Sequence, residues 1–408
     1  MSSRFVTGLD IGTSSIKVAV AENAGGRPVL RAIFKEPSAG LRKSAIVDLA
    51  DASPAVARAL SEVKKVAKGA LKSIYVNIGT PQVKVQPSRG IVAVSRADSE
   101  IYQDDIDRVI KASQAVNIAP NRMIVHNITR EYIVDGVGDI IDPLGLSGNR
   151  LEVASLIVDA FTPHVKSIMR VVELGGGRIA GLLFDPLVAS RAALSRSQKD
   201  LGVALVDIGA GTTSMTVYEE NKLVDVSVFP VGAGNITNDL AVGLRIPVEA
   251  AESLKVHYGY AVAHDINAKE NVDLKKYITD GRGAISRRFI AEIVESRLAE
   301  IFEFVNNELR LAGKVGQLPG GVILVGGGAK LPGLTELAKQ ELKLFSQIGL
   351  ASLEEWGEGT AKFTETFEDP EYVNVLGLVL SGTDQEAWRS AKSSSPWNLK
   401  NLFRYFAP

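Results

Sequence analysis

The strongest constraint on the fold is an internal repeat. The segment VTGLDIGTSSIKVAVAE around Asp10 matches VALVDIGAGTTSMTVYE around Asp207, almost half of the 408 residues later. Each copy has an apolar run, a turn of small hydroxylated residues and an alternating strand, which predicts a β-hairpin. Asp-Ile-Gly turns also recur in unrelated β-rich chains, but two copies in the same pattern favour a duplicated fold.

A third glycine turn follows a predicted strand at 322–325 and precedes a predicted helix at 334–342. Because glycine has no side chain, such a turn lets a ligand approach the backbone closely. The nearby helix N-terminus offers free N–H groups that favour anions or polar rings. In a duplicated fold, this third turn strengthens the prediction of a ligand site.

Two blocks between the glycine turns are predicted to be inserted modules. Residues 74–161 indicate strands at 74–79, 82–86, 91–95, 123–134 and 150–161, with a helix from Asp104 to about Asn117. Residues 236–318 are mostly helical, with an apolar stripe formed by Phe289, Ile293, Leu298, Ile301, Phe302, Val305 and Leu309. The polar, serine-rich stretch 382–395 predicts a linker.

The composition excludes several classes of protein. The 46 Lys and Arg against 47 Asp and Glu leave a net charge of −1, so there is no global cationic field and we expect no nucleic-acid partner. With no cysteine and 4 histidines, disulfides and thiolate chemistry are excluded, and a transition-metal centre is not expected. No apolar run reaches the roughly 20 residues that span a bilayer, so any membrane role would be peripheral.

The two hairpin turns suit a triphosphate, because facing backbone N–H groups and hydroxyls can hold phosphates from both sides. Asp10 and Asp207 end the first strands and can hold Mg²⁺ through water, since Mg²⁺ keeps several waters and takes one or two carboxylates. Lys17 can add a positive charge to the β- or γ-phosphate. Its alternative is a solvated strand lysine.

The three glycine turns resemble the phosphate-1, phosphate-2 and adenosine motifs of the actin, Hsp70 and hexokinase superfamily. Within it, the chain is similar to the FtsA family of bacterial cell-division proteins. PVGAGNITND from Pro230 resembles the family's connecting turn, AESLK from Ala251 its nucleotide-edge helix, and IVESRLAEIF from Ile293 its long helix. The resemblance covers residues 5–406. It implies the α/β class and a duplicated actin-like (ribonuclease H-like) ATPase fold, with an inserted α+β subdomain, a helical subdomain and a C-terminal amphipathic helix.

The resemblance also implies a division of the chain. The expected parts are subdomain 1A at 1–83 and 162–200, an inserted SHS2-like subdomain 1C at 84–161, subdomain 2A at 201–235 and 319–381, subdomain 2B at 236–318, a linker at 382–395 and the amphipathic helix at 396–408.

Matched motifs imply a set of contacts to ATP. The phosphate contacts are Gly12, Thr13, Ser14 and Ser15 on one side and Gly209, Gly211, Thr212 and Thr213 on the other. The other nucleotide-binding residues expected near them are Lys17, Ala210 and Gly234. Glu252 and Lys255 are expected to meet the ribose, and Gly327, Gly328 and Lys330 the adenine end. Asp185 stands where related ATPases often have a Glu or Gln that orients the attacking water. Because Asp is one methylene shorter, we expect ATP binding with slow turnover.

The C-terminal segment predicts a short amphipathic helix that begins at Pro396, after Ser395 as N-cap. Its apolar arc would bind an anionic membrane surface, with basic residues on the flanks. Trp397 falls off this arc. The remaining predicted membrane residues are Leu399, Lys400, Leu402, Phe403, Arg404 and Phe406. Docking onto the chain's own fold is the alternative, which the predicted linker and the family resemblance make less favoured.

The resemblance implies a peripheral protein on the cytoplasmic face of the cell membrane at the division site. It would polymerise, bind the C-terminal peptide of the tubulin-like GTPase FtsZ, anchor FtsZ to the membrane and help to assemble the septal ring with other division proteins. Two alternatives remain open. One is a PilM-like protein of pilus assembly, whose first phosphate motif is similar, and the other is a small-molecule kinase on the same fold.

Overall fold

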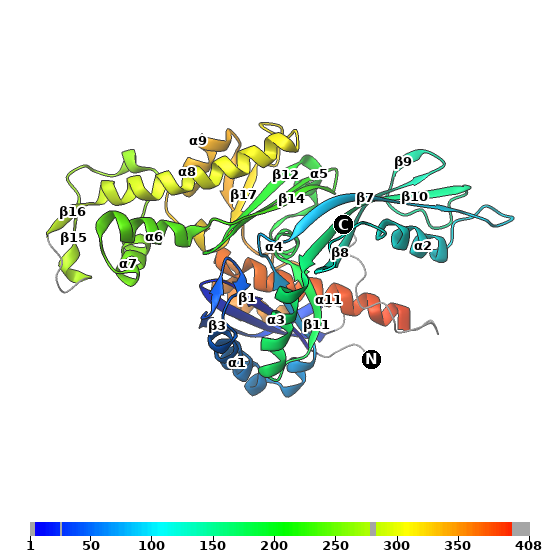
Figure 1. Cartoon of the computed structure of the whole chain (residues 1–408), viewed down its shortest axis with the longest axis horizontal. Helices are drawn as coiled ribbons and strands as arrows, with labels where there is room; N and C mark the ends of the chain where they lie inside the picture. The colour runs from blue at the N-terminus through cyan, green and yellow to red at the C-terminus, as the bar shows by residue number, and fades with distance from the viewer. Residues whose placement is uncertain (1–4, 25–26, 278–282, 394–408) are drawn as a thin grey trace.

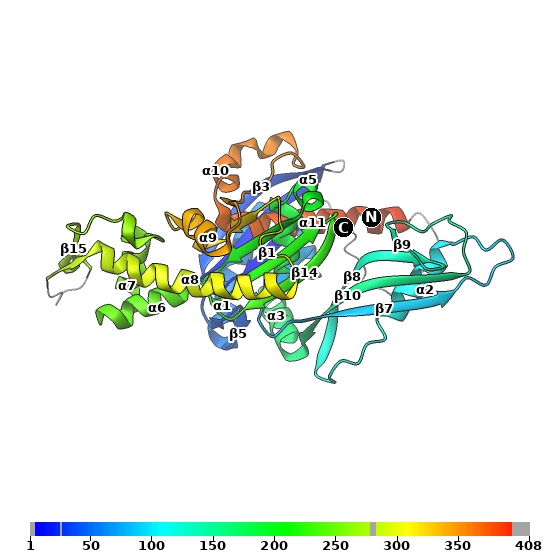
Figure 2. The same ribbon diagram turned by 90° about the horizontal axis from the view of Figure 1, so that it is seen from above.

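The computed structural model describes residues 5–24, 27–277 and 283–393. Two five-stranded sheets form the centre, and two further modules extend to opposite ends of the long axis (Figures 1 and 2). Within these residues, no helix is long and apolar enough to cross a membrane.

The first sheet has the strand order β11-β6-β1-β2-β3. β1 and β2 form the first predicted hairpin, with Asp10 opposite Lys17. Helix α11 packs on β1 where Gly8 allows a close approach, because a Cβ there would lie 2.7 Å from the Val375 carbonyl oxygen. The elements are β1 (Phe5–Ile11), β2 (Ser15–Ala24), β3 (Arg27–Pro37), β4 (Leu41–Arg42), β5 (Ala45–Ile46), α1 (Leu49–Val66), β6 (Ile74–Ile78), α3 (Thr162–Leu174), β11 (Ile179–Phe184), α4 (Asp185–Ala193) and α11 (Val373–Ser393).

The second sheet repeats the first, with the order β14-β13-β12-β17-β18. β12 and β13 form the second hairpin, with Asp207 opposite Ser214, and β17 lies parallel to β12 as β6 does to β1. The predicted duplication is therefore confirmed. The elements are α5 (Arg196–Leu201), β12 (Val203–Ile208), β13 (Thr213–Glu219), β14 (Lys222–Phe229), β17 (Val322–Val325), α9 (Leu334–Leu342), β18 (Ser346–Ile348) and α10 (Thr364–Phe367).

The inserted module, which we call the 1C module, is a four-stranded sheet with the order β7-β10-β8-β9 and one helix, α2. The two strands predicted at 82–86 and 91–95 are wrong, because β7 runs unbroken through Gly90. This glycine is not a turn: a Cβ there would lie 2.1 Å from the Val109 carbonyl oxygen of α2, so it allows close packing. The elements are β7 (Lys84–Ala93), α2 (Gln103–Ser113), β8 (Arg122–Val134), β9 (Val137–Ile140) and β10 (Arg150–Phe161).

A helical module lies at the other end of the molecule (Figure 1). The predicted apolar stripe of its longest helix, α8, is displaced in the first two turns, where Ile290 and Val294 are buried while Phe289 is 42% exposed. From Leu298 onward the predicted residues are buried. The elements are α6 (Ala233–Leu244), α7 (Val248–Tyr258), β15 (Asn271–Asp273), β16 (Ala284–Ser286) and α8 (Arg287–Leu311).

The linker predicted at 382–395 does not begin at Gly382, because α11 continues to Ser393. A Cβ at Gly382 would lie 2.5 Å from the Tyr75 ring, so this glycine also serves close packing. Glu386 is buried, and its carboxylate accepts hydrogen bonds from Ser73 and Tyr75. These buried hydrogen bonds attach the first part of the predicted linker to the first sheet, although its polar composition is typical of a linker. The predicted membrane helix at 396–408 lies outside the described residues.

Candidate functional site

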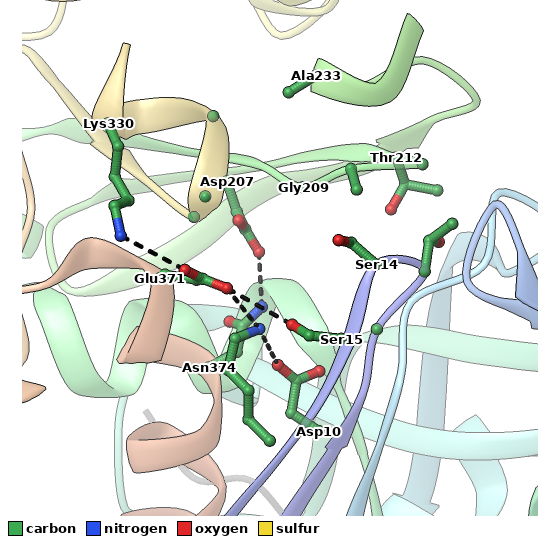
Figure 3. Close-up of a pocket in the computed structure, with 18 of the residues that line it drawn as sticks. Asp10, Ser14, Ser15, Asp207, Gly209, Thr212, Ala233, Lys330, Glu371 and Asn374 are labelled. Atoms are coloured by element: carbon green, nitrogen blue, oxygen red, sulfur yellow. Dashed lines mark hydrogen bonds and ion pairs between the residues drawn. The ribbon is translucent and has the colours of Figure 1, made fainter. Parts of the chain in front are cut away.

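A cavity of about 450 Å³ lies between the two central sheets, where the three glycine turns meet. This volume falls within the usual range of small-molecule sites. Among the residues predicted to bind nucleotide or metal, all line the cavity except Thr213 and Gly234. Figure 3 shows Ser14 and Thr212 entering from the two opposite halves of the molecule.

The two phosphate turns have the same geometry. The Gly12 N–H donates to the Ser15 carbonyl at 3.1 Å, and the Gly209 N–H donates to the Thr212 carbonyl at 2.9 Å. A Cβ on either glycine would lie within 3.0 Å of the accepting oxygen, so each turn depends on its glycine. The repeated sequence therefore builds the same tight turn twice.

The connecting turn supports the second phosphate turn from behind. The N–H groups of Ala233 and Gly234 donate to the carbonyls of Gly209 and Ala210, both at 2.8 Å. A Cβ at Gly234 would lie 2.7 Å from the Ala210 oxygen. Gly234 therefore shapes the turn and does not line the cavity. Thr213 lies fully buried in β13.

Three buried carboxylates face the cavity: Asp10 at the end of β1, Asp207 at the end of β12 and Asp185 at the start of α4. Burial and the Asp10 charge raise the pKa of Asp207 to about 6, although a hydrogen bond from Asn374 lowers it in part. Burial and the neighbouring charges of Asp10 and Asp207 raise the pKa of Asp185 well above its ordinary value. The three carboxylates thus lie close enough for their charges to interact, and a cation between them would stabilise their ionised forms.

Two asparagines that the sequence analysis missed orient these carboxylates. Asn77 donates to Asp10 at 3.0 Å and to Asp185 at 3.2 Å, and it accepts from the Ile11 N–H at 2.7 Å. Asn374, on α11, donates to Asp207 at 2.7 Å. The only available signal for Asn77 was a polar residue inside the apolar run 74–78. Asn374 had none, because only the fold brings α11 beneath β12.

The carboxylates fit a hydrated Mg²⁺ better than a metal held by the protein alone. Among the described residues, no group of three or more Asp, Glu, His or Cys side chains is arranged to hold a metal ion. Within the same residues, Asp185 Oδ1 is buried without a hydrogen-bond partner. Because Mg²⁺ typically takes few protein carboxylates and completes its shell with water and phosphate oxygens, the residues fit that group.

Four further charged side chains line the cavity: Lys17, Lys35, Lys330 and Glu371. Lys17 is 7% exposed and pairs with Asp10 at 3.3 Å, which excludes the solvated lysine alternative. Burial lowers its pKa, but the Asp10 and Glu371 carboxylates outweigh burial and the net shift is upward. Lys35 and Glu371 were missed because β3 and the turn before α11 carry no phosphate motif.

The remaining wall combines polar and apolar residues. Lys255 is buried and donates to Glu252 at 2.7 Å and to the Thr237 hydroxyl at 2.9 Å, so both residues predicted at the ribose lie together. Val256, Leu331 and Pro332 add apolar surface beside the third glycine turn. Such a wall suits a sugar next to an aromatic base.

The 1C module reaches the site through one histidine. His126 on β8 accepts a hydrogen bond from the Phe184 N–H at 3.0 Å, directly before Asp185. Burial lowers the pKa of His126 to about 3, so the ring stays neutral and can accept this bond. Sequence patterns gave no indication of this contact, which joins two separate modules.

The duplicated sheets and the cleft between them define an actin-like fold. A solved structure described as the PilM-PilN type IV pilus biogenesis complex matches with a TM-score of 0.64 and 18% identity, covering 93% of this chain and 98% of the other. MreB5 of Spiroplasma citri bound to AMPPNP matches with a TM-score of 0.54 and 14% identity, covering 97% and 99%. These likenesses concern the fold alone.

The sequence comparisons define the family. A family model described as cell division protein FtsA matches residues 204–377, and one described as the SHS2 domain inserted in FtsA matches residues 81–159. FtsA of Bacillus subtilis (strain 168) is 34% identical over 91% of this chain and 82% of its own length. FtsA of Pseudomonas aeruginosa is 31% identical over 95% of this chain and 91% of its own length. The chain therefore belongs to the FtsA family of cell division proteins.

Proposed function

We propose that this chain is an ATP-binding adaptor that polymerises at the cytoplasmic face of the cell membrane and anchors FtsZ there. The nucleotide part rests on the two glycine turns across one cavity, which are closed by equivalent hydrogen bonds and each lie beside a buried aspartate. Family membership supports the role in cell division.

In this proposal the two phosphate turns supply backbone N–H groups and hydroxyls from Thr13, Ser14 and Thr212 to the phosphates. Asp10 and Asp207 would hold a hydrated Mg²⁺ ion, which would supply positive charge to the phosphates. Glu252 and Lys255 meet the ribose, and the turn with Gly327 and Gly328 meets the adenine end. Lys17 contributes its charge from within the first hairpin.

Asp185 supports slow turnover. Its carboxylate is buried, accepts a hydrogen bond from Asn77 and has a pKa raised well above its ordinary value. The oxygen that already accepts a hydrogen bond from Asn77 is a weaker acceptor for a water proton. Its short side chain also limits its reach toward a γ-phosphate.

Two measurements test nucleotide binding. Titration calorimetry on the full chain is expected to show ATP binding that weakens strongly when Mg²⁺ is chelated, and steady-state assays are expected to show slow hydrolysis. Asp10→Asn should remove most of the Mg²⁺ dependence, whereas the exposed Asp104→Asn should leave it unchanged. Absence of ATP binding, or rapid hydrolysis, would contradict this part of the proposal.

A second experiment tests the adaptor. The full chain, with ATP and anionic liposomes, is expected to form filaments on the lipid and to recruit the FtsZ C-terminal peptide. We place the peptide site in the helical module, residues 236–318. Removing residues 396–408 should abolish lipid binding but retain peptide binding. Persistent lipid binding would refute the anchor, and nucleotide-dependent phosphorylation of a small molecule would favour the kinase alternative.

A further inference from the structure

Glu371 has an unusual position for an acidic residue in a predicted phosphate site. Its two carboxylate oxygens lie 2.7 Å from Lys35 Nζ, 3.7 Å from Lys17 Nζ and 3.5 Å from Lys330 Nζ. The Ser15 hydroxyl of the first phosphate turn also faces it at 3.5 Å. One carboxylate therefore faces three lysines of the cavity, although Lys17 also pairs with Asp10 at 3.3 Å and Lys330 with Asp369 at 2.7 Å. Figure 3 shows the contacts of Glu371 with Lys330 and with the Ser15 hydroxyl.

The backbone fixes this carboxylate in place. Glu371 lies in the short 3₁₀ turn Pro370–Tyr372, and its N–H donates to the Asp369 side chain at 2.9 Å. The Gly326 N–H donates to the Pro370 carbonyl at 3.0 Å, which attaches the turn to the third glycine turn. Glu371 is therefore held inside the cavity and is not a surface side chain that happens to touch it.

The charge of Glu371 is also secure. Burial would raise its pKa, but Lys35, Lys17 and Lys330 outweigh burial and hold the pKa below its ordinary value. The side chain is 15% exposed, so solvent screens these contacts only in part. Glu371 thus presents a permanent negative charge at the place where the lysines would meet phosphate.

We propose that Glu371 is an internal competitor for the phosphates: its carboxylate contacts Lys17, Lys35 and Lys330, and a bound nucleotide must take over these contacts. The inference rests on the proposed function, because it concerns the same site. It assigns Lys35 as a further phosphate contact. It also makes Glu371 a residue that sets affinity according to the number of phosphates, since a longer phosphate chain must take over more of the lysine contacts.

The direct test is Glu371→Gln in the full chain, which keeps the shape and removes the charge. We expect ATP to bind about tenfold more tightly and ADP to gain less than ATP, whereas adenosine binding stays unchanged. The matched control is Glu368→Gln, an exposed residue outside the cavity. Unchanged or weaker ATP binding by Glu371→Gln, or an equal gain for adenosine, would overturn the proposal.

A readout without nucleotide separates this proposal from the proposed function. In the protein without nucleotide, Glu371→Gln removes the ion pair of Lys35 and one of the two carboxylate partners of both Lys17 and Lys330. Its melting temperature should therefore fall below that of wild type and of Glu368→Gln. A wild type that binds no ATP would refute the proposed function. A wild type that binds ATP, with no change in Glu371→Gln, would refute only the competition.

A double-mutant cycle tests the role of Lys35. Lys35 is the closest partner of Glu371. Because the Lys35 side chain is 44% exposed, Lys35→Gln should preserve folding. We expect Lys35→Gln to weaken ATP binding and to reduce the gain that Glu371→Gln produces, because both changes act on one contact. Strictly additive effects on the ATP affinity would show that Lys35 and Glu371 act independently and would overturn the assignment.

Discussion

Replacing Asp207 with Asn should stabilise the protein in the absence of nucleotide and divalent cations. Asp207 has its pKa raised from 3.8 to about 6, mainly by burial. Well above pH 6, keeping this carboxylate ionised in the folded state costs about 3 kcal/mol relative to the unfolded chain, at about 1.4 kcal/mol per pKa unit. Asn has the same shape and carries no charge, so the variant avoids that cost.

The pH dependence identifies the cause. The folded state takes up the proton first as the pH falls through 6, so wild type gains stability relative to Asp207→Asn until the unfolded value of 3.8 is reached. The advantage of the variant should therefore shrink from about 3 kcal/mol at pH 8 to less than about 2 kcal/mol at pH 5.

Scanning calorimetry in EDTA measures the difference. If the chain unfolds as one unit, about 3 kcal/mol corresponds to a rise in melting temperature of about 3 to 4 °C at pH 8. Asp104→Asn, an exposed change of the same charge, should shift stability by no more than about 0.5 kcal/mol. A variant that melts at or below wild type at pH 8 would refute the reasoning.

Two further predictions concern stability. His164→Leu should reduce the loss of stability between pH 7.5 and pH 5, because burial lowers the pKa of His164 from 6.5 to about 4. As the pH falls below 6.5, the histidine takes up a proton in the unfolded chain before it does so in the folded one. This difference destabilises wild type by about 2 kcal/mol at pH 5. Equal pH slopes in thermal melts would contradict this. Gly377→Ala should destabilise by about 3 kcal/mol, because its Cβ would lie 2.0 Å from the Val188 carbonyl oxygen where α11 meets α4. Gly69→Ala, which meets only the Phe5 ring at 3.5 Å, is the control, and equal denaturant midpoints for the two variants would refute the packing argument.

Local patterns predicted the parts of the fold that local chemistry determines. The two hairpins, the third glycine turn and α9 follow from apolar periodicity and from glycine at positions where a Cβ would collide. Two predictions were wrong for the same reason: the break between the strands predicted at 82–86 and 91–95, which contains Gly90, and the linker predicted to begin at Gly382. Each glycine allows another segment to approach closely, and that partner is distant in the sequence.

The site was predicted in the same uneven way. Motif residues such as Gly12 and Gly209 were found because each sits in a repeated local turn. Asn77, Asn374 and Glu371 were missed, since each acts on a residue far away in the sequence and only the packing of strands and helices brings them together. Such partners carry no periodic signal of their own.

Helix α11 mechanically connects the C-terminal end of the described chain to the cleft. Its 21 residues form a rod of about 31 Å that packs on the first half, while Asn374 in its first turn holds Asp207 of the second half. The predicted membrane segment follows directly after this rod. If the proposed membrane anchor and filament exist, tension on the tail would run along α11 to the base of the cleft, so that a pull on the tail and the proposed nucleotide site would act on the same helix.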